Sequence, residues 1–312
     1  MGYFFQGHET LSDGVKRIAR EQFDKIVQHI KSAKKNRDEA IHDIRVSLKK
    51  LRSLLRLVQV KHDDVLTQEK ICYRDAARRI SDVRDATAMI EAFDRLTKHY
   101  ADQLAPEAFT ALRKPFLRTQ KRQRGNENRA LAEVARMLKS ARTRVNDWPI
   151  DDNGFAVLRP GFKRVYRKGR TTMAQAQSKP SVENLHKWRK RVKDLEYQIR
   201  LLTPIWQGML GELTNELERL ADYLSEDHDL ALLRETMLQE TPEGRTRVGT
   251  MVALIDQRRG ELQVEATRLG IRLYGEKPSA FVRRIEVYWR TWCRESTLTP
   301  IVIVDPEMAQ HG

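Results

Sequence analysis

A histidine followed by evenly spaced cations distinguishes the segment EAIHDIRVSLKKLRSLLRL, residues 39–57. In an α-helix, with about 100° of rotation per residue, the histidine and the cations share one stripe about 80° wide and about 21 Å long. The neighbouring arc is apolar and includes Ile44, Leu48 and Leu55, so we expect the stripe at the edge of a packed core. Guanidinium, ammonium and imidazolium groups in one row can bind the oxygens of a phosphate polymer. This first basic stripe consists of His42, Arg45, Lys49, Arg52 and Arg56.

The same pattern occurs again 144 residues later, in the segment ENLHKWRKRVKDLEYQIRL, residues 183–201. Seven of the nineteen paired positions are identical, but Glu196 replaces the counterpart of Arg52. Like charges one turn apart destabilise a helix by roughly a few tenths of a kcal/mol per pair, so their presence in both copies favours a polyanionic ligand. This second basic stripe consists of His186, Arg189, Lys193 and Arg200.

Two further pairs of segments indicate that the chain contains two related halves. ISDVRDATAM, residues 80–89, aligns at the same offset with LSEDHDLALL, residues 224–233. GVKRIAR, residues 14–20, resembles GFKRVYR, residues 161–167, at an offset of 147. A repeat of this length indicates two related domains rather than a solenoid of short units.

The expected fold is all-α. Turn-forming residues collect between Pro149 and Pro160, so we place the boundary near Asp151 and predict domains at 1–150 and 151–312. The apolar spacing predicts eight helices, at 10–33, 38–60, 65–100, 106–147, 157–177, 181–203, 207–238 and 245–295. Two tandem four-helix bundles are the natural arrangement.

Several signals refine this helical prediction. Ser181 is a candidate N-cap, the helix at 65–100 is expected to bend near residues 81–85, and Gly275 with Pro278 should interrupt the last helix. Residues 299–304, TPIVIV, are the one candidate strand.

Composition points to a polyanionic partner. The chain has 58 Lys and Arg against 43 Asp and Glu, a formal charge of +15 and a pI near 9.9. Such a field attracts polyanions, whether nucleic acid, anionic membrane or another phosphate polymer. The two cysteines, Cys72 and Cys293, make neither a disulfide framework nor a cysteine zinc site, which favours a reducing cytoplasm. No run approaches the ~18 apolar residues of a membrane span, and the N-terminus does not resemble a secretory signal, so no membrane association is expected.

Two groups of acidic residues could supply metal ligands. Glu39 with His42, and Glu183 with His186, match the Glu-x-x-His spacing of di-iron bundles. Arg45 would lie on the same face as His42 and repel a dication, so no metal or cofactor is predicted. A second acidic group could likewise bind a cation, but ion pairs or a cap at the helix bend are the simpler prediction; its members are Asp82, Asp85, Glu226 and Asp229.

Nucleic-acid binding and phosphate chemistry are the competing functions. The basic stripes lack interleaved aromatic residues for base stacking, since Trp188 falls on the apolar arc and is expected in the core. Nucleic acid is therefore a possible but less favoured partner. The sequence has no phosphate-binding Gly-x-x-x-x-Gly-Lys-Ser/Thr loop and no recognised catalytic group, so we expect no enzymatic activity, although an accessory enzyme of phosphate metabolism is an alternative.

The two His-x-x-Arg-x-x-x-Lys copies, the ISDVRD and LSEDHD segments and LKSAR at 138–142 resemble the CHAD family, named for its histidine-containing α-helical domain. The resemblance extends from about residue 10 to residue 295. It implies two four-helix bundles related by a pseudo-two-fold axis, with basic helices facing each other across a central groove or pore. It also implies binding of inorganic polyphosphate and association with polyphosphate granules in the cytoplasm.

The resemblance also implies which side chains contact the polymer. These are both basic stripes, His42, Arg45, Lys49, Arg52, Arg56, His186, Arg189, Lys193 and Arg200, with Arg17, Arg20, Arg164 and Arg167 as additions. Because a nearby anion stabilises the imidazolium form of histidine, we expect binding to strengthen below about pH 7.

Overall fold

The computed structural model describes residues 2–7, 9–33, 35–58, 64–103, 106–123, 127–150, 154–240 and 245–296, apart from the side chains of residues 82–86, 103, 106–111, 122–123, 127, 240 and 245–247. These residues form eleven α-helices and three single-turn 3-10 helices without any strand, which confirms the all-α prediction. The candidate strand at 299–304 and the boundary near Asp151 lie outside the described residues.

Six of the helices belong to the first half of the chain. They are α1 (Leu11–Ser32), α2 (Arg37–Leu57), α3 (Asp64–Arg79), α4 (Ser81–His99), α5 (Pro106–Gln123) and α6 (Glu127–Arg144). The second half has five helices, α7 (Phe155–Ser178), α8 (Val182–Leu202), α9 (Gln207–Glu240), α10 (Arg245–Leu273) and α11 (Pro278–Glu295).

Local signals explain where four of the helices begin. The side chains of Thr10, Asn36 and Ser181 cap α1, α2 and α8 by accepting backbone N–H groups, and Ser181 is the cap predicted from the sequence. Pro278 occupies the first turn of α11, where its missing N–H costs nothing, so the predicted break in the last helix is confirmed. The helix expected at 65–100 is divided at Ile80 into α3 and α4, whereas its counterpart α9 runs unbroken through the equivalent place.

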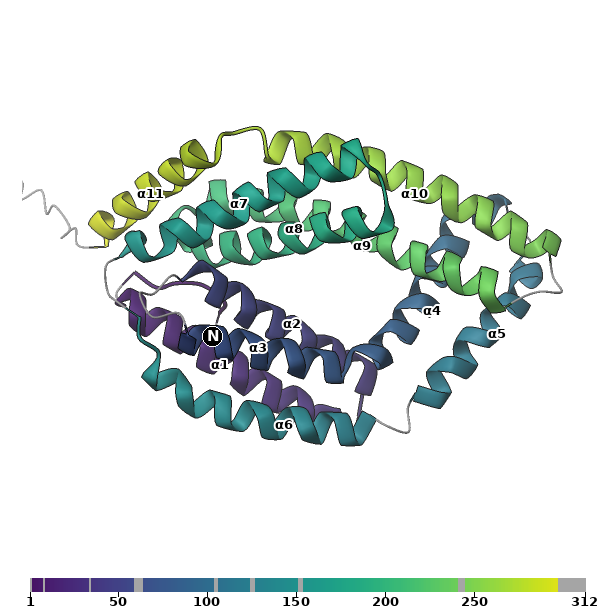
Figure 1. Ribbon diagram of the computed structural model, residues 1–312, viewed down its shortest axis with the longest axis horizontal. Helices are drawn as coiled ribbons and strands as arrows, with labels where there is room; N and C mark the ends of the chain where they lie inside the picture. Colours follow the sequence, from purple (N-terminus) through teal and green to yellow (C-terminus); the bar gives the residue numbers. More distant parts are fainter. Residues whose placement is uncertain are drawn as a thin grey trace, which may run out of the picture.

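The helices pack in two regions (Figure 1). In one region α1, α2, α3 and α6 form a bundle, and α2 contacts α7 and α8 of the second half. In the other, the hairpin of α4 and α5 packs against α9 and α10 around a separate core that includes Phe93, Phe116, Leu233 and Ile255. Because both halves build this second core, the arrangement is more interleaved than two bundles in tandem.

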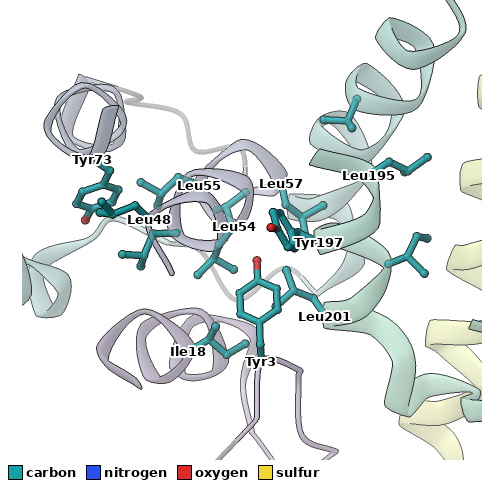
Figure 2. Close-up of a cluster of buried hydrophobic side chains, with 14 of the residues drawn as sticks. Tyr3, Ile18, Leu48, Leu54, Leu55, Leu57, Tyr73, Leu195, Tyr197 and Leu201 are labelled. Atoms are coloured by element: carbon teal, nitrogen blue, oxygen red, sulfur yellow. The ribbon is translucent and has the colours of Figure 1, made fainter. Parts of the chain in front are cut away.

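The N-terminal segment joins the halves near the ends of α2 and α8. Tyr3 lies among Ile18, Tyr197 and Leu201, with its ring edge-on to that of Tyr197 at 6.4 Å between centroids (Figure 2). Its hydroxyl donates to the carbonyl of Lys50 at 2.9 Å. Tyr3 and Phe5 therefore belong to the main core, the larger of the two clusters of buried hydrophobic residues, at the seam between the two halves.

Close approach of two helices also defines this seam. A Cβ atom on Gly161 would lie 2.0 Å from the carbonyl oxygen of Leu57, so glycine lets α7 contact the end of α2 directly. None of the helices in the described part of the chain combines the length and hydropathy that a membrane span requires.

Candidate functional site

The two basic stripes lie on α2 and α8, and equivalent hydrogen bonds hold them. Arg45 donates through Nη1 to Ser81 Oγ at 2.7 Å, and Arg189 donates through Nε to Ser225 Oγ at 2.8 Å. Each serine in turn donates to the carbonyl four residues earlier, of Ala77 or of Ala221. All three pairs of residues differ by 144 positions, so the repeat found in the sequence is also a repeat of individual contacts.

Helices α2 and α8 meet through polar contacts near their C-terminal ends. Ser53 Oγ donates to the carbonyl of Asp194 at 2.9 Å, and Gln198 Nε2 donates to the carbonyl of Ser53 at 3.4 Å. Arg56 forms an ion pair with the Asp194 carboxylate at 2.5 Å. Ser53, Asp194 and Gln198 are all buried, which makes this seam a specific crossing of the two helices.

Cations from three helices converge at the crossing. Partial burial, followed by the charges of Arg56, Arg74 and Arg191, lowers the pKa of Arg52 to about 10. Burial together with Arg191 and Arg52 also lowers the pKa of Lys190. Asp194 contacts two of these cations, since it pairs with Arg191 at 2.9 Å as well as with Arg56. We call the set Arg52, Arg56, Arg74, Lys190 and Arg191 the crossing cluster.

Three members of the crossing cluster were missed in the sequence. Arg74 lies on α3, and Lys190 and Arg191 replace Val46 and Ser47 of the first copy, so the repeat gave no signal for them. Arg191 is also about 140° from His186 around its own helix. The crossing of α2 and α8 brings Lys190 and Arg191 toward Arg52, and the packing of α3 against α2 brings Arg74 there.

Lys193 and Arg200, the two C-terminal cations of the second basic stripe, are paired with acids of their own half. Glu196 is only 1% exposed and contacts Lys193 at 3.1 Å and Arg200 at 2.9 Å. Arg200 also pairs with Glu218 at 3.1 Å. Glu196 therefore balances the two C-terminal cations of its stripe.

The histidines of the two stripes have different surroundings. His186 stacks on His228 of α9, with 4.3 Å between ring centroids. Partial burial, then Lys190 and Arg189, lowers the pKa of His186 to about 4, and burial with Arg189 lowers that of His228 to about 3. Both rings are therefore neutral near pH 7 in the free protein. His42 is exposed in the second turn of α2.

The four additional candidate arginines, two on α1 and two on α7, have different surroundings. Arg17 pairs with Glu9 at 2.7 Å and Glu21 at 3.1 Å, and donates to the carbonyl of Phe4. Arg164 donates to the carbonyl of Arg56 at 3.1 Å, where a cation compensates the C-terminal end of α2. Arg20 is half-buried on α1 and Arg167 is exposed on α7. The structure thus brings Arg164 to the end of the first stripe and places Arg17 in a network with the N-terminal segment.

The candidate acidic metal ligands with described side chains form ion pairs or hydrogen bonds with neighbouring residues. Glu183 is 76% exposed and pairs with Lys187 at 2.7 Å, and Glu39 accepts from the amide of Asn36. Within the described residues, no group of three or more His, Cys, Asp or Glu side chains could hold a metal ion. Glu226 pairs with Arg258 at 2.9 Å and Asp229 with Arg95 at 3.5 Å, in line with the ion pairs expected there. The side chains of Asp82 and Asp85 lie outside the described set.

Comparison with known proteins gives consistent matches. A family model described as the CHAD domain matches residues 17–238, a span that contains both basic stripes. The crystal structure of the CHAD domain from the plant Ricinus communis superposes with a TM-score of 0.62 and 15% identity, covering 87% of this chain and 95% of that one. PptA from Streptomyces chartreusis superposes with a TM-score of 0.60 and 14% identity, covering 85% and 99%. A search of curated proteins found no match. At these identities the structural likeness shows the all-α fold.

Proposed function

The chain belongs to the CHAD domain family, and on that basis we propose that it binds inorganic polyphosphate through the first basic stripe, the adjoining crossing cluster, and His186 with Arg189. The proposal depends above all on one observation: five cations of α2, α3 and α8 converge at the helix crossing, where Asp194 is the acid that contacts two of them. Such a concentration of positive charge is unfavourable in the free protein and would be relieved by a polyanion.

The chemistry of the cluster suits a phosphate polymer. Arginine presents a planar fork that can bind two phosphate oxygens at once, and lysine adds a mobile point charge. The lowered pKa of Arg52 reflects burial without sufficient compensation, so a bound phosphate would restore its usual protonation preference. The overall charge of +15 would attract the polymer from a distance.

The aromatic residues beside the second stripe favour polyphosphate over nucleic acid. Trp188 is 1% exposed and Tyr197 is 6% exposed, and both belong to the main core, as expected for Trp188. Proteins that bind single strands without sequence preference generally stack bases on accessible aromatic side chains. We therefore propose that the protein recognises the charge of the polymer without stacking bases, and that it binds polyphosphate rather than catalysing its reactions. We also propose that it is associated with polyphosphate granules in the cytoplasm.

A binding titration tests this function. Long-chain polyphosphate is titrated at physiological salt into the wild type, into Arg52→Gln/Lys190→Gln and into the control Arg113→Gln/Arg234→Gln. The control removes two cations of the helices that build the second core, where their ion-pair partners are Asp94 and Asp256. We expect the first variant to lose at least about ten-fold in affinity, from two lost charge-assisted contacts, and the control to change by less than about two-fold.

Three outcomes would contradict the proposal. Equal losses in the two variants would mean that net charge alone governs binding. Displacement of bound polyphosphate by an oligonucleotide, with no displacement in the reverse direction, would favour nucleic acid as the ligand. Release of phosphate by the purified protein would replace the binding role with an enzymatic one.

A further inference from the structure

The helices that flank the two stripes carry opposite charges at equivalent positions. Helix α3 lies beside α2 as the first part of α9 lies beside α8, and the offset of 144 residues is confirmed at the end of this region by Ser81 and Ser225. At that offset Arg74 and Arg78 of α3 correspond to Glu218 and Asp222 of α9. Together with Arg52 and Glu196, three equivalent positions are cationic in one half and acidic in the other.

In the second half these acids contact the cations of the stripe. Arg200 lies 2.9 Å from Glu196 and 3.1 Å from Glu218, and Lys193 lies 3.1 Å from Glu196 and 4.0 Å from Asp222. Two cations therefore share three carboxylates, a formal charge of −1 for the set. Glu196 is buried, so its carboxylate cannot turn away to admit another anion.

The equivalent positions of the first half are all occupied by lysine or arginine. They are Lys49, Arg52, Arg56, Arg74 and Arg78. Among the described side chains, Asp194 pairs with Arg56, and Asp75 pairs with Arg74 at 2.9 Å and with Arg78 at 3.9 Å. No acid with a described side chain lies within ion-pairing distance of Arg52, which stands where the second half has Glu196.

We infer that Glu196, Glu218 and Asp222 are internal anions that occupy the phosphate-binding positions of the second stripe and confine polyphosphate to the first half and the helix crossing. The inference rests on the proposed function and adds the residues that decide where the polymer is held. A carboxylate about 3 Å from both Lys193 and Arg200 uses the donors that a phosphate would need, and its charge repels the polymer. A polyphosphate chain would meet this repulsion as it extends along α8 from Arg189 toward Arg200.

Removing one of these charges should open the second stripe. In Glu218→Gln the side chain keeps its shape while Arg200 loses one of its two anionic partners. The matched control is Glu216→Gln, on the same helix and of similar exposure, whose partner Arg219 lies outside the stripe. Both variants raise the net charge of the protein by one, so they differ only in which cation they release.

The test is a titration with long-chain polyphosphate at several salt concentrations, on variants whose cooperative melting shows that they are folded. We expect Glu218→Gln to bind about 3- to 10-fold more tightly with a steeper salt dependence, and Glu216→Gln to change by less than about two-fold. Glu196→Gln should act in the same direction as Glu218→Gln. Equal affinities for Glu218→Gln and Glu216→Gln would overturn the inference while wild-type binding left the proposed function intact. Absence of wild-type binding would overturn both.

Discussion

Asp194 offers the sharpest test of the charge balance at the helix crossing. Its carboxylate pairs with Arg56 at 2.5 Å and with Arg191 at 2.9 Å, and the residue is 6% exposed. In Asp194→Asn both guanidinium groups lose their anionic partner, whereas the backbone hydrogen bond from Ser53 to residue 194 is kept. The variant therefore isolates the contribution of one negative charge in a field of cations.

The expected loss of stability follows from the burial of this group. Removing one partner of a buried ion pair typically costs about 3–5 kcal/mol, because the remaining charge is left uncompensated. Arg56 and Arg191 keep about a quarter of their side-chain surface in contact with solvent, at 27% and 24%, and screening reduces that figure. We expect a decrease of about 2–3 kcal/mol in the free energy of unfolding, and a lower melting temperature.

Polyphosphate should reverse this effect. The variant has one anion fewer at the crossing, so a bound polymer replaces the missing charge and raises the melting temperature of Asp194→Asn more than that of the wild type. Thermal unfolding with and without polyphosphate measures both shifts. The control is Asp256→Asn, which removes an exposed acid paired with Arg234 and should cost less than about 1 kcal/mol. If Asp194→Asn were as stable as the wild type, or if the polymer raised both melting temperatures equally, the described charge balance would be incorrect.

Two further predictions concern the histidine stack and the seam between the halves. In the folded protein, burial and the neighbouring charges of Arg189, Lys190 and Arg259 lower the pKa values of His186 and His228 from the usual 6.5 to about 4 and about 3. As the pH falls, protons therefore bind the unfolded chain before the folded one, and stability should fall between about pH 6.5 and pH 4. Unfolding in urea at pH 7 and pH 5 measures this loss, and an identical loss in His228→Gln would show that the stack is not responsible. Gly161→Ala should destabilise the protein by about 2 kcal/mol or more, because the added Cβ would overlap the carbonyl of Leu57, whereas Gly208→Ala has open space around it and should be neutral or stabilising. Equal melting temperatures for these two variants would contradict the close contact of α7 with α2.

Much of the candidate site could be predicted from one helix at a time. The stripe on α2 depends only on the angle between successive residues, and its recurrence on α8 required only the comparison of two segments. The same comparison aligned Ser81 with Ser225, although it gave no indication that these serines accept hydrogen bonds from Arg45 and Arg189. The weakness of the second stripe was also visible, because Glu196 interrupts it.

The features that the sequence did not predict depend on contacts between helices. Lys190 and Arg191 are absent from the first copy, and Arg17 resembles its counterpart Arg164 in sequence yet pairs with Glu9 instead of capping a helix end. The division of residues 65–100 into two helices likewise has no equivalent in the unbroken α9, and it allows α4 and α5 to build a second core with the other half.

The amino-acid sequence by itself determined the helices, the internal repeat and the rows of cations, because each of these depends on local periodicity and on the spacing of residue types. Only the tertiary structure decided which charges of different helices meet: that Arg56 of α2 pairs with Asp194 of α8, that Arg200 of α8 pairs with Glu218 of α9, and that Arg52 is left without an ion-pair partner among the described side chains. The physical reason is that the energy of a charge depends on its distance from other charges and on its burial, and both are set by how the helices cross.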